Sequence, residues 1–271
     1  MTPYSPVRTR PVGGRRELQL ALLGTTVVIL LFVISGSFSG RMDALPFTPP
    51  GVAHPFGTDD LGRDLLREVA RGVRTSLLLG LGTTAIAMIV GTAVGLAAGM
   101  SSPLADELLM RSADVVASLP TLIIAILVAA LFGGSLPALA MVLGLTRWPL
   151  VARLVRAEAA SLRHRDFVLA AKALGATPAR VVLVHVLPHA ATVALAATGI
   201  LFGGALVSEA ALAFVGLGDP SVTSLGQLTS NGFAFVSHAP WMWIAPTAAI
   251  VVLTVAVAIA ADRPAPGDWP Q

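Results

Sequence analysis

The chain is poor in the residues that most enzymes use for chemistry. Its 271 residues include no cysteine, one tyrosine, one lysine (Lys172) and only 12% charged residues. The lack of cysteine excludes a thiol nucleophile, a disulfide and a thiolate metal site. A phosphate-binding P-loop needs Gly directly before Lys and then Ser or Thr. Lys172 follows Ala171, so the chain has no such loop.

Long apolar runs take the place of these residues. Hydrophobic residues make up 55% of the chain, and the mean hydropathy is +0.81. A membrane-spanning helix needs about 20 mostly apolar residues. Six segments meet this requirement: 18–38, 75–100, 115–132, 136–154, 190–215 and 241–261. Arg147 interrupts the fourth, and Pro149 favours a kink there. The sequence therefore predicts an all-α fold, a polytopic membrane helical bundle with six transmembrane helices.

Basic residues are distributed unevenly between these spans. Membrane proteins keep Lys and Arg mainly in short cytoplasmic segments. A cytoplasmic N-terminus places most of them on that side: Arg8, Arg10, Arg15, Arg16, Arg111, Arg153, Arg156, Arg163, Arg165, Lys172, Arg180 and Arg263. The opposite side then carries Arg41, Arg63, Arg67, Arg71 and Arg74, balanced by nearby acids.

This topology divides the chain into five parts. We expect a cytoplasmic N-terminal segment (1–17), a first transmembrane helix (18–38), an extracytoplasmic loop with an amphipathic helix (39–74), a five-helix core domain (75–261) and a cytoplasmic tail (262–271). The first span resembles a signal peptide because two arginines precede it. Its apolar run is longer than that of a signal peptide and no Ala-x-Ala ends it, so we expect a retained anchor.

The predicted outer loop contains charges at helical spacing. Thr58 is a possible cap for a helix whose first turn carries Asp59 and Asp60. Acid–base pairs recur along one face and an apolar stripe along the other, formed by Leu61, Leu65, Val69 and Val73. The pattern predicts an interfacial helix with ion pairs at Asp60–Arg63, Asp64–Arg67 and Glu68–Arg71. A cation site at Asp59, Asp60 and Asp64 is the alternative.

Glycines repeat every fourth residue in the second span, at Gly91, Gly95 and Gly99. Such a stripe lets another helix approach closely. It indicates either a tight bundle within the chain or a contact between two subunits.

A short charged insert (163–188) separates the fourth and fifth spans. Asp166 is the expected cap of a first helix with Phe167, Ala170, Ala171 and Leu174 on one face, and Gly175 is its expected end. A second helix begins with Thr177 as cap and Pro178 in the first position, and Pro188 is expected to perturb it. The first helix is too short to be stable alone. It is expected either to dock in a groove of a cytoplasmic protein or to lie on lipid headgroups.

Several motifs together resemble the inner-membrane permeases of ATP-binding cassette importers, specifically the second permease of the dipeptide, oligopeptide and nickel group. That family's cytoplasmic signature is Glu-Ala-Ala, three residues, Gly, nine residues and Ile-x-Leu-Pro. It falls on Leu169-Ala170-Ala171, Gly175 and His185 to Pro188, with Leu169 in place of Glu and His185 in place of Ile. The runs 54–64, 144–149 and 209–218 are also similar to the group.

The resemblance implies a type I importer permease fold with a cytoplasmic coupling helix, and a non-catalytic translocation subunit in a bacterial cytoplasmic membrane. Its implied cargo is di- or oligopeptides, with nickel complexes or haem as alternatives. Its implied partners are a second permease forming a heterodimer, an extracytoplasmic substrate-binding protein and cytoplasmic ATPases that hold ATP and Mg. No nucleic acid or cofactor is implied. The implied ATPase-coupling residues are Asp166, Phe167, Leu169, Ala170, Ala171, Leu174, Gly175, Thr177, Pro178 and Pro188.

Other classes of function fit the sequence less well. In a secondary transporter or channel, Glu209 and Arg147 would be pathway charges, and in a permease they are candidates for a pathway, gating or inter-helix role. Gly216 to Asp219 matches the Gly-x-Gly-Asp signature of intramembrane aspartyl proteases, but the chain has no Tyr-Asp partner. The five histidines are dispersed, and His185 and His189 are expected to be packing or interfacial residues rather than metal ligands.

Overall fold

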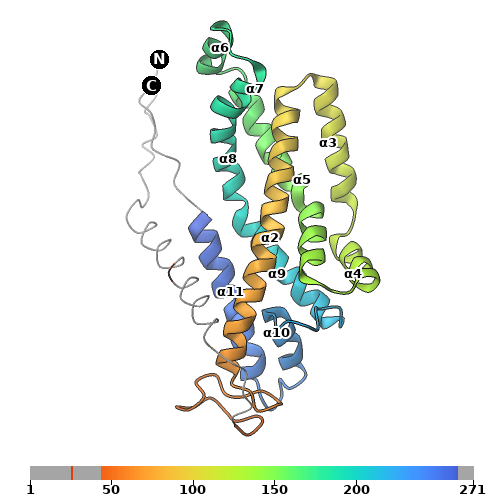
Figure 1. The fold of residues 1–271 in the computed structure, drawn as a ribbon, viewed down its shortest axis with the longest axis vertical. Coiled ribbons are helices and arrows are strands. Elements are labelled where there is room, and N and C mark those ends of the chain that lie inside the picture. Colours follow the sequence, from red (N-terminus) through yellow and green to blue (C-terminus); the bar gives the residue numbers. More distant parts are fainter. Residues whose placement is uncertain (1–25, 27–43, 262–271) are drawn as a thin grey trace, which may run out of the picture.

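The computed structural model describes Thr26 and residues 44–261, and every regular element among residues 44–261 is helical (Figure 1). The only β-type pairing in this range is an isolated bridge between Thr58 and Asp64. The all-α prediction is therefore confirmed for the described residues. The predicted N-terminal segment, first span and C-terminal tail lie outside them.

The longest helix, α2 (Leu65–Met100), joins two elements that the sequence separates. The predicted interfacial helix and the second span form one continuous helix, because nothing between them breaks the backbone ladder. The expected cap at Thr58 is wrong. Asp64 caps the helix instead, since its carboxylate accepts hydrogen bonds from the amides of Leu66 and Arg67 at 2.9 and 3.3 Å.

The third predicted span is also wrong in its bounds. Two helices, α3 (Pro103–Ser118) and α4 (Thr121–Phe132), meet at an angle of 70°. Pro120 lies at the break, where its ring and missing amide prevent a continuous helix. The charged first turns of α3 are tied to the next helix, α5 (Leu136–Leu162), because Asp106 pairs with Arg156 at 2.5 Å.

The glycine stripe of α2 packs inside the chain. A Cβ at Gly91 would lie 2.5 Å from Val151 of α5, and one at Gly95 would lie 2.6 Å from the carbonyl oxygen of Ala152. Larger side chains would therefore push the two helices apart. Of the two interpretations of the stripe, a tight bundle within the chain or a contact between subunits, this packing against α5 supports the tight bundle.

The remaining elements run from one end of the bundle to the other. They are α6 (Asp166–Ala173), α7 (Pro178–Arg180), the π-helix η1 (Val181–Val186), α8 (Leu187–Ala196), α9 (Thr198–Phe214), α10 (Leu225–Phe233) and α11 (Trp241–Ala261). The fifth predicted span is thus divided at Ala197, whereas the sixth has the predicted bounds. Figure 1 shows α6 at one end of the bundle and α10, with residues 44–64, at the opposite end. We call these the α6 end and the α10 end.

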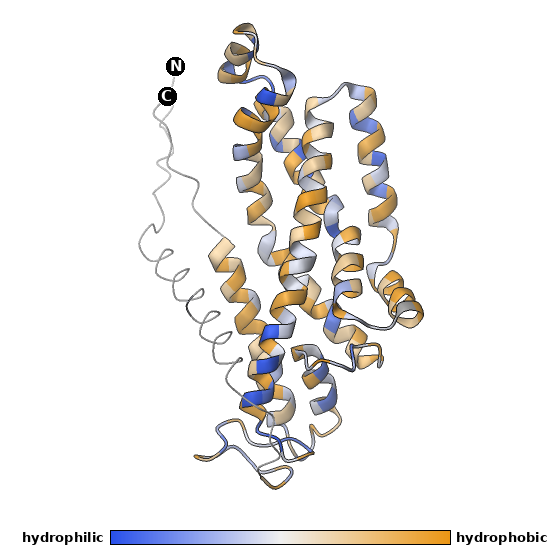
Figure 2. Cartoon of the chain, in the orientation of Figure 1, coloured by the Kyte–Doolittle hydropathy of each residue, from blue (hydrophilic) through white to orange (hydrophobic). Residues whose placement is uncertain are grey.

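Four helical segments in the described part are long and apolar enough to cross a membrane: α2, α5, Pro178–Ala196 and α11. The bent pair of α3 and α4 brings the number to five. Figure 2 shows apolar residues along most of α4 and α11, which is the surface expected of helices in lipid.

Candidate functional site

The helix α6 begins and ends through backbone geometry. The expected cap at Asp166 is wrong, since Arg165 holds the cap position and makes no side-chain cap bond. Asp166 instead lies in the first turn, where a carboxylate complements the helix dipole. At the other end, the amide of Gly175 donates to the carbonyl of Lys172 and that of Ala176 donates to Ala171, both at 3.0 Å. With Gly175 at φ +86°, this is a Schellman end, as the glycine predicted.

The apolar residues of α6 face in two directions. Val168 is fully buried and Ala171 is partly buried, both in an apolar cluster that includes Val181 of η1. On the outer side, the exposed fractions are 42% for Phe167, 48% for Leu169 and 90% for Leu174. Ala170 is exposed as well. Ala171, which was predicted to lie on the docking face, thus lies on the packed face. Leu169 lies on the exposed face.

Two histidines connect α6 to the helices that follow it. The ring of Phe167 lies 6.5 Å from that of His185 and 5.8 Å from that of His189, measured between ring centroids. Both histidines thus lie beside Phe167, with His185 partly buried and His189 exposed, which fits the expected packing or interfacial position. Phe167 remains partly exposed despite these contacts.

The second helix of the insert starts as predicted and then widens. The hydroxyl of Thr177 accepts a hydrogen bond from the amide of Arg180, and Pro178 occupies the first turn. The π-helix η1 follows, and its cap amide, that of Leu187, bonds to the carbonyl of Val182, five residues earlier. Pro188 has no amide to continue an α-helical ladder, so the predicted perturbation is confirmed as this π segment.

Glu209 lies in α9 near the α10 end and is only 4% exposed. Its carboxylate accepts hydrogen bonds from the hydroxyl of Ser224 and from the backbone of Gly226. Ser224 is the N-cap of α10. The buried acid therefore contacts the start of a neighbouring helix.

Arg147 lies in α5 and reaches the same helix, α9. Its guanidinium donates to the carbonyl of Gly204 at 2.9 Å and to the hydroxyl of Ser208 at 2.7 Å. Its Nε is buried without a hydrogen-bond partner. Arg147 of α5 thus bonds to Ser208, the residue of α9 that directly precedes Glu209, whereas Glu209 bonds to Ser224 and Gly226.

Asp219 connects the loop after α9 to the start of α5. Its carboxylate accepts from the amide of Leu136 at 3.2 Å and from the amide of Ser221 at 2.9 Å. The hydroxyl of Ser221, which also donates to this carboxylate, holds the pKa of Asp219 below its usual value. Asp219 is thus held as a helix cap, and no second acid is among its hydrogen-bond partners in the described residues.

Two acids of residues 44–64, Asp59 and Asp64, are engaged in ion pairs and in hydrogen bonds with backbone amides. Asp59 pairs with Arg63 at 2.6 Å, where the sequence predicted Asp60 as the partner. Asp64 pairs with Nδ1 of His54 at 2.7 Å, and Glu68 pairs with Arg71 at 3.0 Å as predicted. In residues 44–261, no group of three or more metal-binding side chains forms a candidate metal site.

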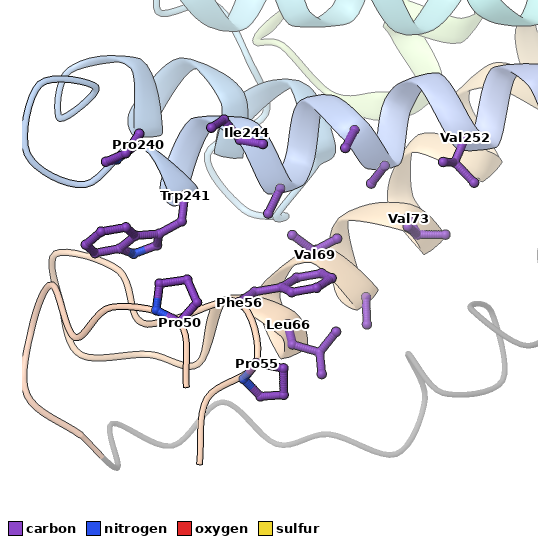
Figure 3. A pocket seen from close by; sticks show the side chains of 14 residues that line it. Pro50, Pro55, Phe56, Leu66, Val69, Val73, Pro240, Trp241, Ile244 and Val252 are labelled. Carbon is purple, nitrogen blue, oxygen red and sulfur yellow. The ribbon is translucent and has the colours of Figure 1, made fainter. Parts of the chain in front are cut away.

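Two cavities lie at opposite ends of the bundle. One, of about 610 Å³, adjoins the insert and is lined by residues that include Met100, Lys172 and Leu183. The other, of about 730 Å³, lies at the α10 end between residues 44–64, α2 and α11, with Phe56 and Trp241 among its lining residues (Figure 3). Its lining is almost wholly apolar, so it offers few groups that would recognise a polar molecule.

Helix α10 and its contacts with Glu209 were not predicted from the sequence. A signal for this helix is present, because Ser224 is followed three residues later by Gln227, the spacing of a capping box. Ser224 accepts from the amide of Gln227 at 3.1 Å, so half of that pattern forms.

Known proteins resemble the chain along most of its length. The dipeptide transport system permease protein DppC of Alkalihalophilus pseudofirmus is 30% identical over 249 residues, which cover 89% of this chain and 82% of that protein. The oligopeptide transport system permease protein OppC of Bacillus subtilis is 29% identical over 247 residues, covering 88% of this chain and 81% of that protein.

The fold also resembles a solved structure. A chain of the MetNI methionine ABC transporter in an inward facing conformation superposes with a TM-score of 0.59 at 20% sequence identity. The match covers 72% of this chain and 93% of that one. Residues 66–266 match the family described as "Binding-protein-dependent transport system inner membrane component". This match spans α2 through α11, including α6 and Glu209, and the chain therefore belongs to that family of non-catalytic permease components of ABC transporters.

Proposed function

We propose that this chain is a permease subunit that moves di- or oligopeptides across the cytoplasmic membrane of a bacterium by alternating access. The observation that carries the proposal is the exposed apolar surface of α6, formed by Phe167, Leu169 and Leu174 on a helix that the chain fixes from its other side through Val168. An amphipathic helix of this kind fits a groove of a protein partner. The similarity to the dipeptide permease DppC and the oligopeptide permease OppC supports peptides as the cargo.

Cytoplasmic ATPases are the proposed partners of α6. They bind ATP and Mg, and their closure would move α6 together with η1, because the two pack through Val168 and Val181. The residues proposed for this coupling are the ones that the signature implies, from Asp166 to Pro188. Leu169 stands where the signature has Glu, so contacts here are expected to rest on apolar burial.

The proposed arrangement in the membrane has a cytoplasmic N-terminus, six spans in a type I importer fold and a second permease as heterodimer partner. Basic side chains gathered near the α6 end support a cytoplasmic location for that end, since Arg163, Lys172 and Arg180 all lie in the insert. The substrate-binding protein would then meet the α10 end. Exposed apolar residues along α2, such as Leu81 and Ile89, leave surface for lipid and for the second permease.

Substitution of Phe167 tests the coupling role. In the complex reconstituted with its ATPases and binding protein, Phe167→Asp should reduce substrate-stimulated ATP turnover to the background level, because it places a charge in the apolar contact. Phe167→Leu keeps the contact apolar and should retain most of the turnover. Ala160→Asp adds the same charge at an exposed position of α5, outside the insert, and serves as the control. Full stimulation in Phe167→Asp would refute the proposal.

A second measurement tests the subunit role directly. The purified chain without partners should hydrolyse no ATP, since it contains no P-loop. Hydrolysis that follows this chain through successive purification steps would contradict the role of a non-catalytic subunit.

A further inference from the structure

The first turn of α10 is held by side chains from three different parts of the chain. The amide of Leu225 donates to the hydroxyl of Ser76 in α2 at 3.1 Å. The backbone of Gly226 bonds to Glu209 of α9, and the amide of Gln227 donates to the hydroxyl of Ser224 at 3.1 Å. The first amides of a helix have no partners within the helix. Here three of them are bonded to side chains.

Glu209 is suited to this position by its charge. A buried carboxylate is costly unless hydrogen bonds and positive charge compensate it. The hydroxyl of Ser224, the backbone of Gly226 and the positive end of the α10 dipole provide this compensation. A neutral side chain would lose the attraction to the dipole and would satisfy fewer of these donors.

Glycine at position 226 makes the close approach possible. A Cβ at Gly226 would lie 2.6 Å from Cα of Ala210, in the helix α9 that carries Glu209. It would also collide with the carboxylate of Glu209. The start of α10 is therefore pressed against α9 at the residue next to the buried acid.

The chain connects this contact to the α6 end. From α7 the backbone runs through η1 and α8 into α9, with a single break at Ala197. Arg147 holds α9 one residue before Glu209, through Ser208. On its other side, α10 borders a polar cavity of about 210 Å³ lined by Arg63, Thr223, Gln227 and Asn231, among others. Hydrogen bonds therefore connect α9 to the start of α10, which borders this cavity, so a displacement of α9 can reach the cavity through α10.

We propose that Glu209 is a positioning residue that fixes α10 to α9, so that α10 and the polar cavity beside it follow α9 when the bundle changes conformation. The inference rests on the proposed transport function. It assigns Glu209 a mechanical role at the α10 end and gives it no contact with the transported molecule.

The absence of cysteine allows a direct test. Thr229 is a buried residue of α10, and Thr229→Cys introduces the only thiol of the chain. In intact cells, a membrane-impermeant maleimide should label this thiol about tenfold faster when Glu209→Gln is added, since a hydrogen bond to a charged group contributes on this order to local opening. Ser230→Ala is the control, because it removes a different bond between α10 and α9, from Ser230 to the carbonyl of Ala213. It should leave the labelling rate nearly unchanged.

ATP turnover separates a positioning role from a general loss of structure. In the reconstituted complex, Glu209→Gln should keep its basal turnover but lose most of the stimulation by the binding protein. Unchanged labelling together with unchanged stimulation would overturn the inference. If Glu209→Gln fails to accumulate in membranes, Ser224→Ala removes one donor to the same carboxylate and should raise labelling by a smaller factor. Unchanged labelling in Ser224→Ala would then overturn the inference.

The two proposals fail in different ways. If Phe167→Asp reduces the stimulated turnover to background while Glu209→Gln changes neither labelling nor stimulation, the transport function stands and the role of Glu209 falls. If Phe167→Asp has no effect, the coupling role of α6 falls, whatever the labelling of α10 shows.

Discussion

The two ends of the bundle hold their short helices in different ways. At the α10 end, Ser76, Glu209 and Ser224 bond the first turn of α10, and most of that turn is buried. At the α6 end, α6 buries one side chain, Val168, and exposes its larger apolar residues. The comparison teaches that α10 has its bonding partners within the chain, whereas α6 presents an apolar surface that no other part of the described chain covers.

The largest effect is expected from a side chain at Gly226. Gly226→Ala would place Cβ within 2.6 Å of the backbone of α9, so one of the two helices must shift. We expect a loss of about 3 kcal/mol in the free energy of unfolding, in the range of severe overpacking. Thermal unfolding in detergent measures it.

Gly82→Ala is the matched control for this change. Gly82 lies in α2, and its Cβ would make only an ordinary contact of 3.5 Å with Ala140. Alanine is the better helix former, so stability should stay equal or rise by up to about 1 kcal/mol. Equal stability of the two variants would break the comparison, because α10 would then not be tightly fixed.

A pair of substitutions in α6 sharpens the contrast within that helix. Val168→Ala removes buried methyl groups and should cost about 2 kcal/mol of stability, observed first as faster proteolysis of the insert. Leu174→Ala changes a side chain that is 90% exposed and should leave stability unchanged while it lowers stimulated ATP turnover several-fold. A destabilised Leu174→Ala variant would show that this residue packs within the chain.

The smallest effect is expected at Asp219, which caps α5 from the α10 end. Asp219→Asn should cost about 1 kcal/mol, because the amide replaces a charged acceptor at a helix start. The pKa of Asp219 is lowered, so its contribution is present above the unfolded value of about 3.9 and is lost as the pH falls through the lowered folded value. Unfolding temperatures of variant and parent should therefore differ at pH 7 and converge in acid. A constant difference would contradict this assignment.

The sequence predicted the elements whose signals are local. Gly175 ends α6, Thr177 caps α7 and Pro188 disturbs the helix after it, because each effect depends on the residue's own backbone chemistry. The last span also begins and ends where its apolar run does. These features need no knowledge of the rest of the fold.

The predictions were wrong where contacts between residues far apart in the sequence determine the structure. Thr58 and Asp64 can both cap a helix, but the hydroxyl oxygen of Thr58 already accepts a hydrogen bond from the amide of Thr48, at 2.8 Å. The charges of α3 made its first turns unlike a membrane span, although Asp106 is neutralised by Arg156, 50 residues later. The partners of Glu209 were not predicted either. Ser224 and Gly226 lie at the start of α10, where the sequence had not indicated a helix.

The π-helix η1 sets the rotation between the segments on its two sides, α7 before it and α8 after it. Val181 and Val186 are five residues apart and both fully buried in one cluster. In an α-helix, residues five apart point about 140° away from each other, whereas π-type bonding over five residues brings them toward one side. If the same residues were wound as an α-helix, the segment before η1, which leads back to α6, would turn by about 100° relative to α8. The π turn of η1 thus contributes to the direction in which the apolar surface of α6 points.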